Sequence, residues 1–315
     1  MARKSPLHGK LVTLIGGNGF IGKYVAQALL ERGARVRIAA RHPETAYKLK
    51  PLANLGQLQF ARCDVLDPAS VGAAVAGADA VVNCAGSFAG DQRRLMGEAP
   101  GVVARAASAA GAGAYVELGS IGADPDSPAL FGRAKALGEA NVLAAFPTAT
   151  VLRPSVVFGE DDRFITMFAG VIQAFPVLPV FGPEAKLQLV CVDDVAEAVA
   201  VALEDPATHG GKTYELGGPE VLTMLDIHQR IADAQHRSRT FVPVPDALTA
   251  VFAALPLTPM TSDQWLMLKA GSVVGQGMPG LDKLGIAAKP LGLFLDRWMV
   301  RYREHGRFGA KRPAA

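Results

Sequence analysis

Residues 11–22 read LVTLIGGNGFIG and decide the fold. The apolar run Leu11–Ile15, which is followed directly by glycines, is typical of a buried parallel strand. The periodicity that follows predicts a helix over 20–32, which Gly33 ends. A tight turn, a close backbone approach and close helix–strand packing each require a glycine. This strand–loop–helix unit predicts a pyrophosphate site at the helix N-terminus, built from Gly16, Asn18, Gly19, Phe20, Ile21 and Gly22.

Further apolar runs alternate with helical patterns along the first half of the chain. Strands are expected at 35–40, 58–63, 80–84, 114–118 and 148–152. Such alternation predicts an α/β Rossmann fold, a doubly wound parallel sheet. The alternation weakens after Pro154. We therefore expect a dinucleotide-binding domain over 1–155 and a smaller C-terminal lobe over 156–315, with interleaving of the two left open. Strands near 187–192 and 213–216 and helices near 195–203 and 224–234 are assigned to this lobe.

Composition narrows the class of protein. Of 315 residues, 50% are hydrophobic and 19% are charged, with a net charge of +3. This predicts a large buried core and gives no argument for nucleic acid. The cysteines Cys63, Cys84 and Cys191 are far apart and fit no metal-ligand spacing, so we expect free thiols and no metal. We expect neither a secretory signal nor a transmembrane segment.

The second strand ends without the carboxylate that usually binds the ribose 2′-hydroxyl of NAD. Arg41 stands there instead and suits a 2′-phosphate, so NADP(H) is favoured over NAD(H). The alternative is that Arg41 is a solvated surface charge. At the end of the third strand, Asp64 and Val65 are placed to meet the adenine ring. Asp64 could equally cap the helix that begins near Pro68.

Three residues mark the reactive end of the predicted site. Ser120 follows the fifth strand, and Phe131 and Lys135 share one helix face. Together with the glycine loop, they resemble the short-chain dehydrogenase/reductase superfamily in its extended or atypical branches. That superfamily's catalytic motif is Tyr-x-x-x-Lys, so the resemblance implies that Lys135 binds the nicotinamide ribose. Phe131 replaces the tyrosine and can transfer no proton. Ser120 has no obvious base, and Tyr115 points elsewhere.

The resemblance therefore implies a retained cofactor pocket with a vestigial Ser120–Phe131–Lys135 set. It also implies that the cofactor meets Cys84, Ala85 and Gly86 at the fourth strand, and Pro154 after the sixth. Two of these positions also have alternatives that involve no cofactor. Lys135 could be a surface lysine, and Ser120 could be a helix-capping serine.

Several stretches are similar to a narrower family, the NAD(P)H-binding accessory subunits of respiratory complex I (NADH:ubiquinone oxidoreductase) and their bacterial relatives. This resemblance implies a tightly bound nucleotide, no turnover and complex I subunits as partners. It places the chain peripherally, on the cytoplasmic side of a bacterial inner membrane. The stretches cover nearly the whole chain: 131–139, 145–147, 158–164, 214–219, 257–265, 280–286 and 298–303.

The C-terminal segment combines apolar and basic residues. It predicts a basic amphipathic helix, for which peripheral contact with anionic lipid or a partner subunit is one reading. A core-packing terminal helix is the other. The apolar positions of this segment are Leu291, Leu293, Phe294, Leu295, Trp298 and Met299, and the basic ones are Arg297, Arg301, Arg303, Arg307, Lys311 and Arg312.

Two further functions also stay open for the whole chain. One is an active NADPH-dependent reductase, epimerase or dehydratase, and the other is an NADP(H)-binding redox sensor.

Overall fold

A computed structural model describes residues 5–255, 258 and 260–304. The chain divides into two compact units. The first unit comprises the chain up to Pro154 together with Val192–Leu216 and Val274–Ala287. The second comprises Ser155–Cys191, Gly217–Val273 and the chain from Ala288. Two later segments thus belong to the unit that the N-terminal half builds.

A seven-stranded sheet forms the centre of the first unit, in the order β3-β2-β1-β4-β5-β6-β11. All neighbouring strands are parallel. The order reverses between β1 and β4, and ligands of such sheets bind beside that point, at the carboxyl ends of the strands. The predicted α/β Rossmann class is confirmed. The strands are β1 (Leu11–Ile15), β2 (Arg35–Ala40), β3 (Leu58–Arg62), β4 (Ala80–Asn83), β5 (Ala114–Leu118), β6 (Thr150–Pro154) and β11 (Thr213–Leu216).

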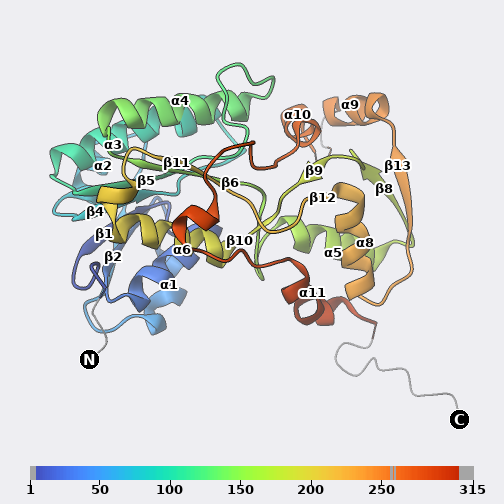
Figure 1. Ribbon diagram of the computed structural model, residues 1–315, viewed down its shortest axis with the longest axis horizontal. Coiled ribbons are helices and arrows are strands. Elements are labelled where there is room, and N and C mark those ends of the chain that lie inside the picture. The colour runs from blue at the N-terminus through green and yellow to red at the C-terminus, as the bar shows by residue number, and fades with distance from the viewer. Residues whose placement is uncertain (1–4, 256–257, 259, 305–315) are drawn as a thin grey trace, which may run out of the picture. The chain divides into compact units, whose positions relative to one another are not determined.

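Helices cover both faces of this sheet (Figure 1), with α2, α3 and α4 on one face and α1 and α6 on the other. Their apolar sides bury against the strands, which are mostly buried except for the edge strand β3, whose residues are half-buried or exposed. A π-helical segment, η2 (Arg93–Glu98), leads into α3. The helices are α1 (Phe20–Glu31), α2 (Pro68–Val75), α3 (Ala99–Ala109), α4 (Leu130–Ala145), α6 (Val192–Glu204) and α7 (Pro206–His209), with the 3-10 segments η1 (Pro43–Leu52) and η3 (Leu281–Leu284).

Three assignments made from the sequence are corrected here. The strand at 213–216 is not part of the C-terminal lobe, because β11 pairs with β6 and completes the main sheet. The helix near 195–203 also belongs to the first unit, where α6 packs against α1. The strand expected over 187–192 is two short strands, β9 (Lys186–Leu187) and β10 (Val190–Cys191). Helix α6 already begins at Val192, where acidic residues in its first turn favour a helix start.

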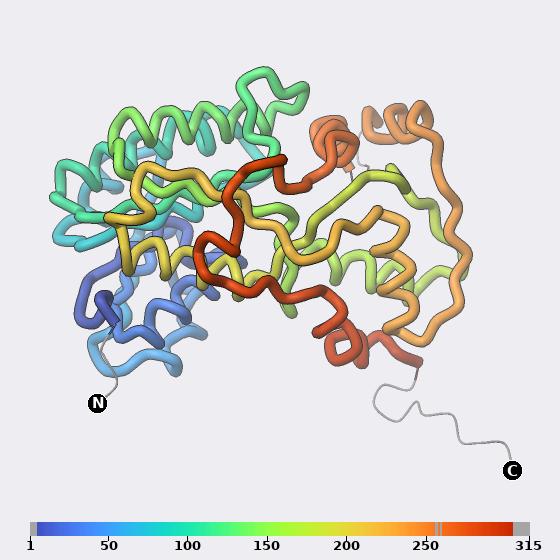
Figure 2. The backbone as a smooth tube through the Cα atoms, in the orientation of Figure 1, coloured from blue at the N-terminus to red at the C-terminus, as the bar shows by residue number. Residues whose placement is uncertain are grey.

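A late segment of the chain returns to the first unit beside β11 (Figure 2). In Val274–Ala287, the carbonyl of Pro279 accepts a hydrogen bond from the backbone N–H of Glu215 at 2.9 Å. Sequence patterning gave no sign of this return, because the segment is neither strand nor regular helix for most of its length.

The second unit has a core of its own. Helices α5 and α8 pack with the inner side chains of β8 in one apolar cluster. Strand β13 pairs parallel with β8. The elements are β7 (Val157–Phe158), α5 (Phe164–Ala174), β8 (Val177–Phe181), β12 (Leu222–Thr223), α8 (Met224–Ala234), β13 (Thr240–Val244), α9 (Asp246–Ala254), α10 (Ser262–Ala270), α11 (Gly292–Met299) and η4 (Val300–Tyr302), besides β9 and β10.

Helix α11 is the amphipathic segment noted in the sequence. Its side chains Leu295, Trp298 and Met299 are buried in the core of the second unit, whereas Leu293 is 65% exposed. Core packing therefore accounts for most of its apolar face. No helix in the described part of the chain has the length and apolar character needed to cross a bilayer. Three of the predicted basic positions lie outside the described residues, namely Arg307, Lys311 and Arg312.

Candidate nucleotide-binding site

The glycine loop joins β1 to α1, and its contacts explain each glycine. Gly16 has a φ of +74°, and an added Cβ would lie 2.9 Å from the backbone N of Ala85. At Gly22 an added Cβ would lie 2.6 Å from Cα of Gly17. Only the carbonyl oxygen of Gly16, at 3.3 Å, comes within 4 Å of a Cβ added at Gly19. Two glycines thus serve the fold, and Gly19 keeps the backbone bare where a ligand would approach.

The first turn of α1 has the features of an anion-binding helix N-terminus. No side chain caps the helix at Gly19, and its first turn has no acidic residue. The N–H groups of Phe20, Ile21 and Gly22 precede the first intrahelical hydrogen bond, which Lys23 N donates to Gly19 O. Unpaired N–H groups and the positive end of the helix dipole fit a pyrophosphate.

Side chains at the ends of β2 and β3 surround the expected adenosine half. The side-chain amide of Asn18 donates to His42 O at 3.3 Å and to Thr45 Oγ1 at 3.0 Å, which ties the glycine loop to η1. Arg41 is exposed and makes no hydrogen bond or ion pair with any other described residue. The guanidinium is therefore open to solvent and accessible to a phosphate.

The carboxylate of Asp64 accepts from Leu66 N at 3.0 Å, so it shapes the turn after β3. It does not cap α2. Asp67 does, accepting from Ala69 N at 3.0 Å. Val65 is half-buried and packs against the apolar cluster under α2 and α3. The helix-cap alternative for Asp64 is thus wrong, since three more residues separate it from the helix start.

The loop after β4 meets α4 at the other end of the strand edge. The thiol of Cys84 is mostly buried, and Ala85 N donates to Asn83 Oδ1 at 3.1 Å. A Cβ added at Gly86 would lie 3.9 Å from Nζ of Lys135. The fold therefore brings Cys84, Ala85 and Gly86 together with Lys135, although about 50 residues of chain separate them.

Lys135 is buried, not a surface lysine, with 8% of the residue exposed. Its Nζ donates to Leu118 O, at the end of β5, at 2.7 Å. Burial lowers the pKa of this ammonium, and the nearby Glu117 and Glu139 carboxylates oppose that shift. A lysine that is buried at the carboxyl edge of the sheet is placed to meet a ligand there.

The other two members of the vestigial set occupy the same edge. Ser120 Oγ donates to Ile121 O at 3.1 Å, and it caps no helix, because α4 has Ala129 at its N-cap. The ring of Phe131 stacks on Phe88 with centroids 4.8 Å apart. Where the superfamily places a hydroxyl, this chain therefore has an apolar aromatic pair.

A buried polar cluster beneath this edge was missed from the sequence. Glu117, on β5, is 3% exposed. Asn83 Nδ2 donates to both of its carboxylate oxygens, at 3.1 and 3.0 Å, and the Tyr115 hydroxyl donates to Oε2 at 3.1 Å. Burial raises the pKa of Glu117 to about 7. The available signal was a glutamate inside a strand expected to be buried on both faces.

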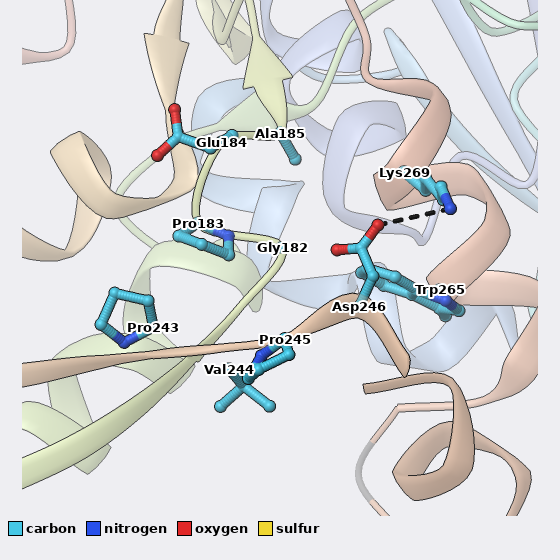
Figure 3. A pocket seen from close by; sticks show the side chains of 10 residues that line it. All are labelled: Gly182, Pro183, Glu184, Ala185, Pro243, Val244, Pro245, Asp246, Trp265 and Lys269. Carbon is cyan, nitrogen blue, oxygen red and sulfur yellow. Dashed lines mark ion pairs between the residues drawn. The ribbon is translucent and has the colours of Figure 1, made fainter. Parts of the chain in front are cut away.

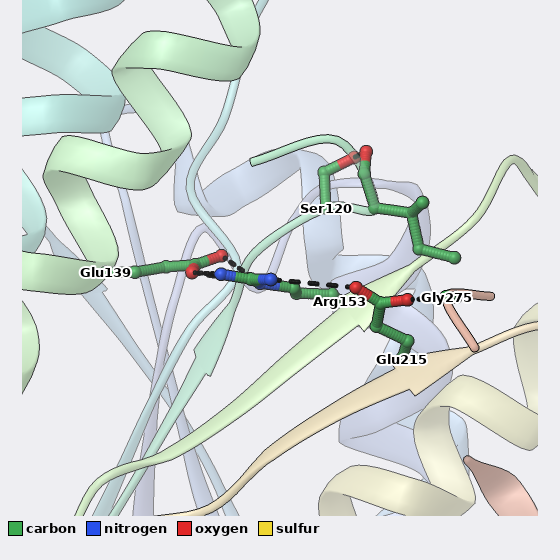
Figure 4. Close-up of polar contacts among 6 residues, drawn as sticks. Ser120, Glu139, Arg153, Glu215 and Gly275 are labelled. Atoms are coloured by element: carbon green, nitrogen blue, oxygen red, sulfur yellow. Dashed lines mark hydrogen bonds and ion pairs between the residues drawn. The ribbon is translucent and has the colours of Figure 1, made fainter. Parts of the chain in front are cut away.

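A second missed cluster joins side chains of α4, β6 and β11 (Figure 4). Arg153 Nε donates to both oxygens of Glu139 at 3.2 and 3.0 Å, and Nη2 reaches Oε2 at 2.6 Å. Nη1 lies 3.6 Å from Glu215 Oε1, and Gly275 N donates to Glu215 Oε2 at 2.7 Å. Because Glu139 and Glu215 are nearly fully buried, the arginine compensates both charges. The three stretches of sequence that carry these residues gave no spacing that links them.

The second unit contains a hollow of about 450 Å³ (Figure 3). Prolines line it with Trp265 and the ion pair of Asp246 and Lys269, whose atoms lie 3.3 Å apart at its rim. None of the residues predicted for the nucleotide site lines this hollow. The candidate site therefore rests on the strand edge of the first unit.

Comparisons with known proteins agree with this geometry. A model of the NAD dependent epimerase/dehydratase family matches residues 12–217. The chain is 33% identical over 261 residues to NADH dehydrogenase (ubiquinone) 1 alpha subcomplex subunit 9, mitochondrial, of Arabidopsis thaliana. The aligned region covers 80% of this chain and 64% of that protein. This chain thus spans less than two thirds of the length of the plant relative.

The mouse protein of the same name is 30% identical over 318 residues, which covers 96% of this chain and 83% of that protein. Among solved structures, an Escherichia coli NADPH-dependent quinone oxidoreductase complexed with NADPH superposes with a TM-score of 0.74 at 21% identity, covering 91% of this chain and 99% of that one. At that identity the structural likeness supports the fold alone.

Proposed function

The chain belongs to the NAD dependent epimerase/dehydratase family, and from this premise we propose that it is a nucleotide-carrying accessory subunit of respiratory complex I without turnover of its own. The observation that carries the proposal is the extent of the similarity to the mouse subunit. It runs over 96% of the chain, whereas the family model ends at residue 217. The second unit, which varies with function in such folds, is therefore included in the likeness.

Loss of the proton donor supports the absence of turnover. Reduction of a carbonyl by a nicotinamide requires a group that protonates the oxygen. Phe131 offers none, the Tyr115 hydroxyl is buried on Glu117, and Ser120 Oγ is bonded to Ile121 O. An active reductase, epimerase or dehydratase would need a donor at this edge, and these side chains are engaged elsewhere or lack a proton to give.

The nucleotide that fits best is NADP(H). The first turn of α1 suits the pyrophosphate, and Arg41 suits a phosphate on the 2′-oxygen of the adenosine ribose. Bound nicotinamide nucleotide would supply a hydride donor or acceptor. In this chain its main consequence is stabilisation of the folded unit, about 4 kcal/mol when the ligand stands at a thousandfold excess over its Kd.

Attachment to the assembly is proposed to run through partner subunits on the cytoplasmic side of a bacterial inner membrane. Helix α11 buries most of its apolar face in the second unit, so it has little apolar surface left for lipid. Leu293, which is 65% exposed, and the basic residues around it are the part of this segment proposed for peripheral membrane contact.

Purification from the native membranes tests the function. The full chain, tagged at its N-terminus, is isolated in mild detergent, and both its co-migrating proteins and its released nucleotide are identified by mass spectrometry. Complex I subunits in constant ratio together with NADPH are the expected result. A chain that leaves the membranes as a free protein in every detergent, without complex I subunits, would overturn the proposal.

A further inference from the structure

No carboxylate among the described residues lies in direct contact with the buried Lys135 ammonium. Its hydrogen bond goes to a neutral group, the carbonyl oxygen of Leu118, at 2.7 Å. A buried ammonium that lacks a nearby negative charge tends to lose its proton. Lys135 must therefore rely on a carboxylate farther away in order to stay charged as the pH rises above neutral.

Two buried carboxylates act on Lys135, and one of them is already engaged. Glu139 forms the two-oxygen pair with Arg153, with contacts of 2.6 to 3.2 Å. Glu117 is different, because the hydrogen bonds that hold it come from neutral groups, the Asn83 amide and the Tyr115 hydroxyl. Once it ionises, above a pKa of about 7, its negative charge is held in place, and no cation among the described residues contacts it.

The groups around Glu117 leave Lys135 as the cation that compensates it. From β4 come Asn83 and the Cys84 thiol, whose pKa burial raises to about 12, so that it stays neutral. From β5 comes Tyr115, whose pKa is raised well above its usual value, so that it is neutral too. From α4 come Lys135 and Glu139. The Coulomb interactions of Glu117 with Lys135 favour the charged form of both.

We propose that Glu117 is a positioning residue for nucleotide binding, whose buried carboxylate keeps the Lys135 ammonium charged at the strand edge where the nicotinamide half of NADP(H) binds. This inference rests on the proposed function, because it presumes that the edge between β4, β5 and α4 receives a nucleotide. Asn83 and Tyr115 hold the carboxylate under the edge, and Lys135 carries the charge to the surface of the site.

The test is the pH dependence of NADPH affinity in the full chain with Glu117→Gln. In the native protein, affinity falls on the alkaline side as Lys135 loses its proton. In the variant that fall is expected about one pH unit lower, because one neighbouring charge is gone. A variant that binds more weakly by the same factor at every pH, with the alkaline fall unmoved, would show that Glu117 only supports the fold.

Two further variants control for structure. Tyr115→Phe removes one hydrogen bond and keeps both charges, so its alkaline fall is expected at the native pH. Glu117→Asp keeps the carboxylate and is expected to restore most of the native profile. A Tyr115→Phe shift as large as that of Glu117→Gln would contradict the charge-based account.

Should Glu117→Gln fail to fold, the double variant with Lys135→Met removes both buried charges, and such pairs are tolerated better than a single unpaired charge. It is expected to fold and to bind NADPH weakly with no alkaline fall; if it also fails to fold, Glu117 is needed independently of Lys135 and the inference is wrong. If the native protein binds NADPH but its affinity has the same pH profile as that of Glu117→Gln, this inference alone is overturned. Native protein that binds no NADPH at any pH overturns the nucleotide site and both proposals.

Discussion

The two ends of the candidate nucleotide site are built in different ways. At the β1 end the site is made of backbone, with Gly16, Gly19 and Gly22 clearing space and the first turn of α1 presenting N–H groups. At the β5 end the site rests on buried side chains from separate elements, with Lys135 bonded to Leu118 O and Glu117 held by Asn83 and Tyr115. A backbone site is encoded by glycine spacing in one short stretch, whereas a charge cluster exists only after β4, β5 and α4 have packed.

The largest effect is expected from Arg153→Met. It leaves Glu139 and Glu215 buried without their counter-charge, and loss of one partner in such a cluster costs about 3–5 kcal/mol. Urea unfolding measures the change. Arg230→Met is the matched control, since Arg230 forms a similar two-oxygen pair with Glu220 in which both side chains are more than a third exposed, and this variant should lose less than about 1 kcal/mol. Equal losses in the two variants would remove the distinction between buried and exposed charge.

The next largest effect is expected from Gly22→Val, which changes the β1 end, where the site is made of backbone. Its Cβ would lie 2.6 Å from Cα of Gly17 and 2.8 Å from Gly16 O, so the loop must move away from α1. NADPH affinity is expected to fall by about 100-fold, equivalent to about 3 kcal/mol. Gly72→Ala in α2 is the control, because nothing lies within 4 Å of its added Cβ, and it should bind NADPH as the native chain does. Fluorescence titration with NADPH compares the three proteins.

Glu117 also gives the β5 end a pH-dependent stability. Burial raises the pKa of Glu117 from 4.5 to about 7, so the folded state holds a proton that the unfolded state releases in that interval. The stability that Glu117 contributes to the folded state is fully present below its pKa in the unfolded chain. It is lost as the pH rises towards its pKa in the folded chain. Relative to Glu117→Gln, the native chain should lose on the order of 3 kcal/mol between these limits. Urea unfolding across this pH range checks it; parallel curves for the two proteins would contradict the burial argument.

Arg41→Ala should lower affinity for NADPH about tenfold and leave affinity for NADH unchanged, because only a 2′-phosphate makes a charge-assisted contact there. Paired titrations with the two nucleotides measure this ratio. The exposed Arg62, at the end of β3, is a control for general loss of positive charge. If Arg62→Ala changes the ratio as much as Arg41→Ala, the selectivity does not belong to Arg41.

The smallest effect is expected from Phe131→Tyr. Phe131 stacks on Phe88 by its ring, and a tyrosine ring can keep that contact. NADPH affinity should stay within about twofold, well inside 1 kcal/mol. Turnover with simple carbonyl acceptors should stay absent. Substantial activity would mean that the other groups at the β5 end still form a complete catalytic site.

The sequence alone predicted the sheet, because buried strands and glycine turns are local patterns. Strands Arg35–Ala40 and Ala114–Leu118 were predicted with the bounds that the structure has. It could not predict the membership of β11 in the main sheet, which depends on a pairing with β6 made across about 60 residues. Nor could it predict that Arg153 joins Glu139 to Glu215, because no spacing records a contact between three elements.

The measurement that tests the central claim most directly is the fate of bound nucleotide in the purified full chain. The protein is loaded with NADPH, freed of excess nucleotide and mixed with a panel of small carbonyl acceptors, and the reduced nicotinamide is followed by its absorbance. The account predicts one NADPH per chain that stays bound and reduced throughout. Rapid oxidation of the bound NADPH by any of these acceptors, or a chain that retains no nucleotide, would contradict it.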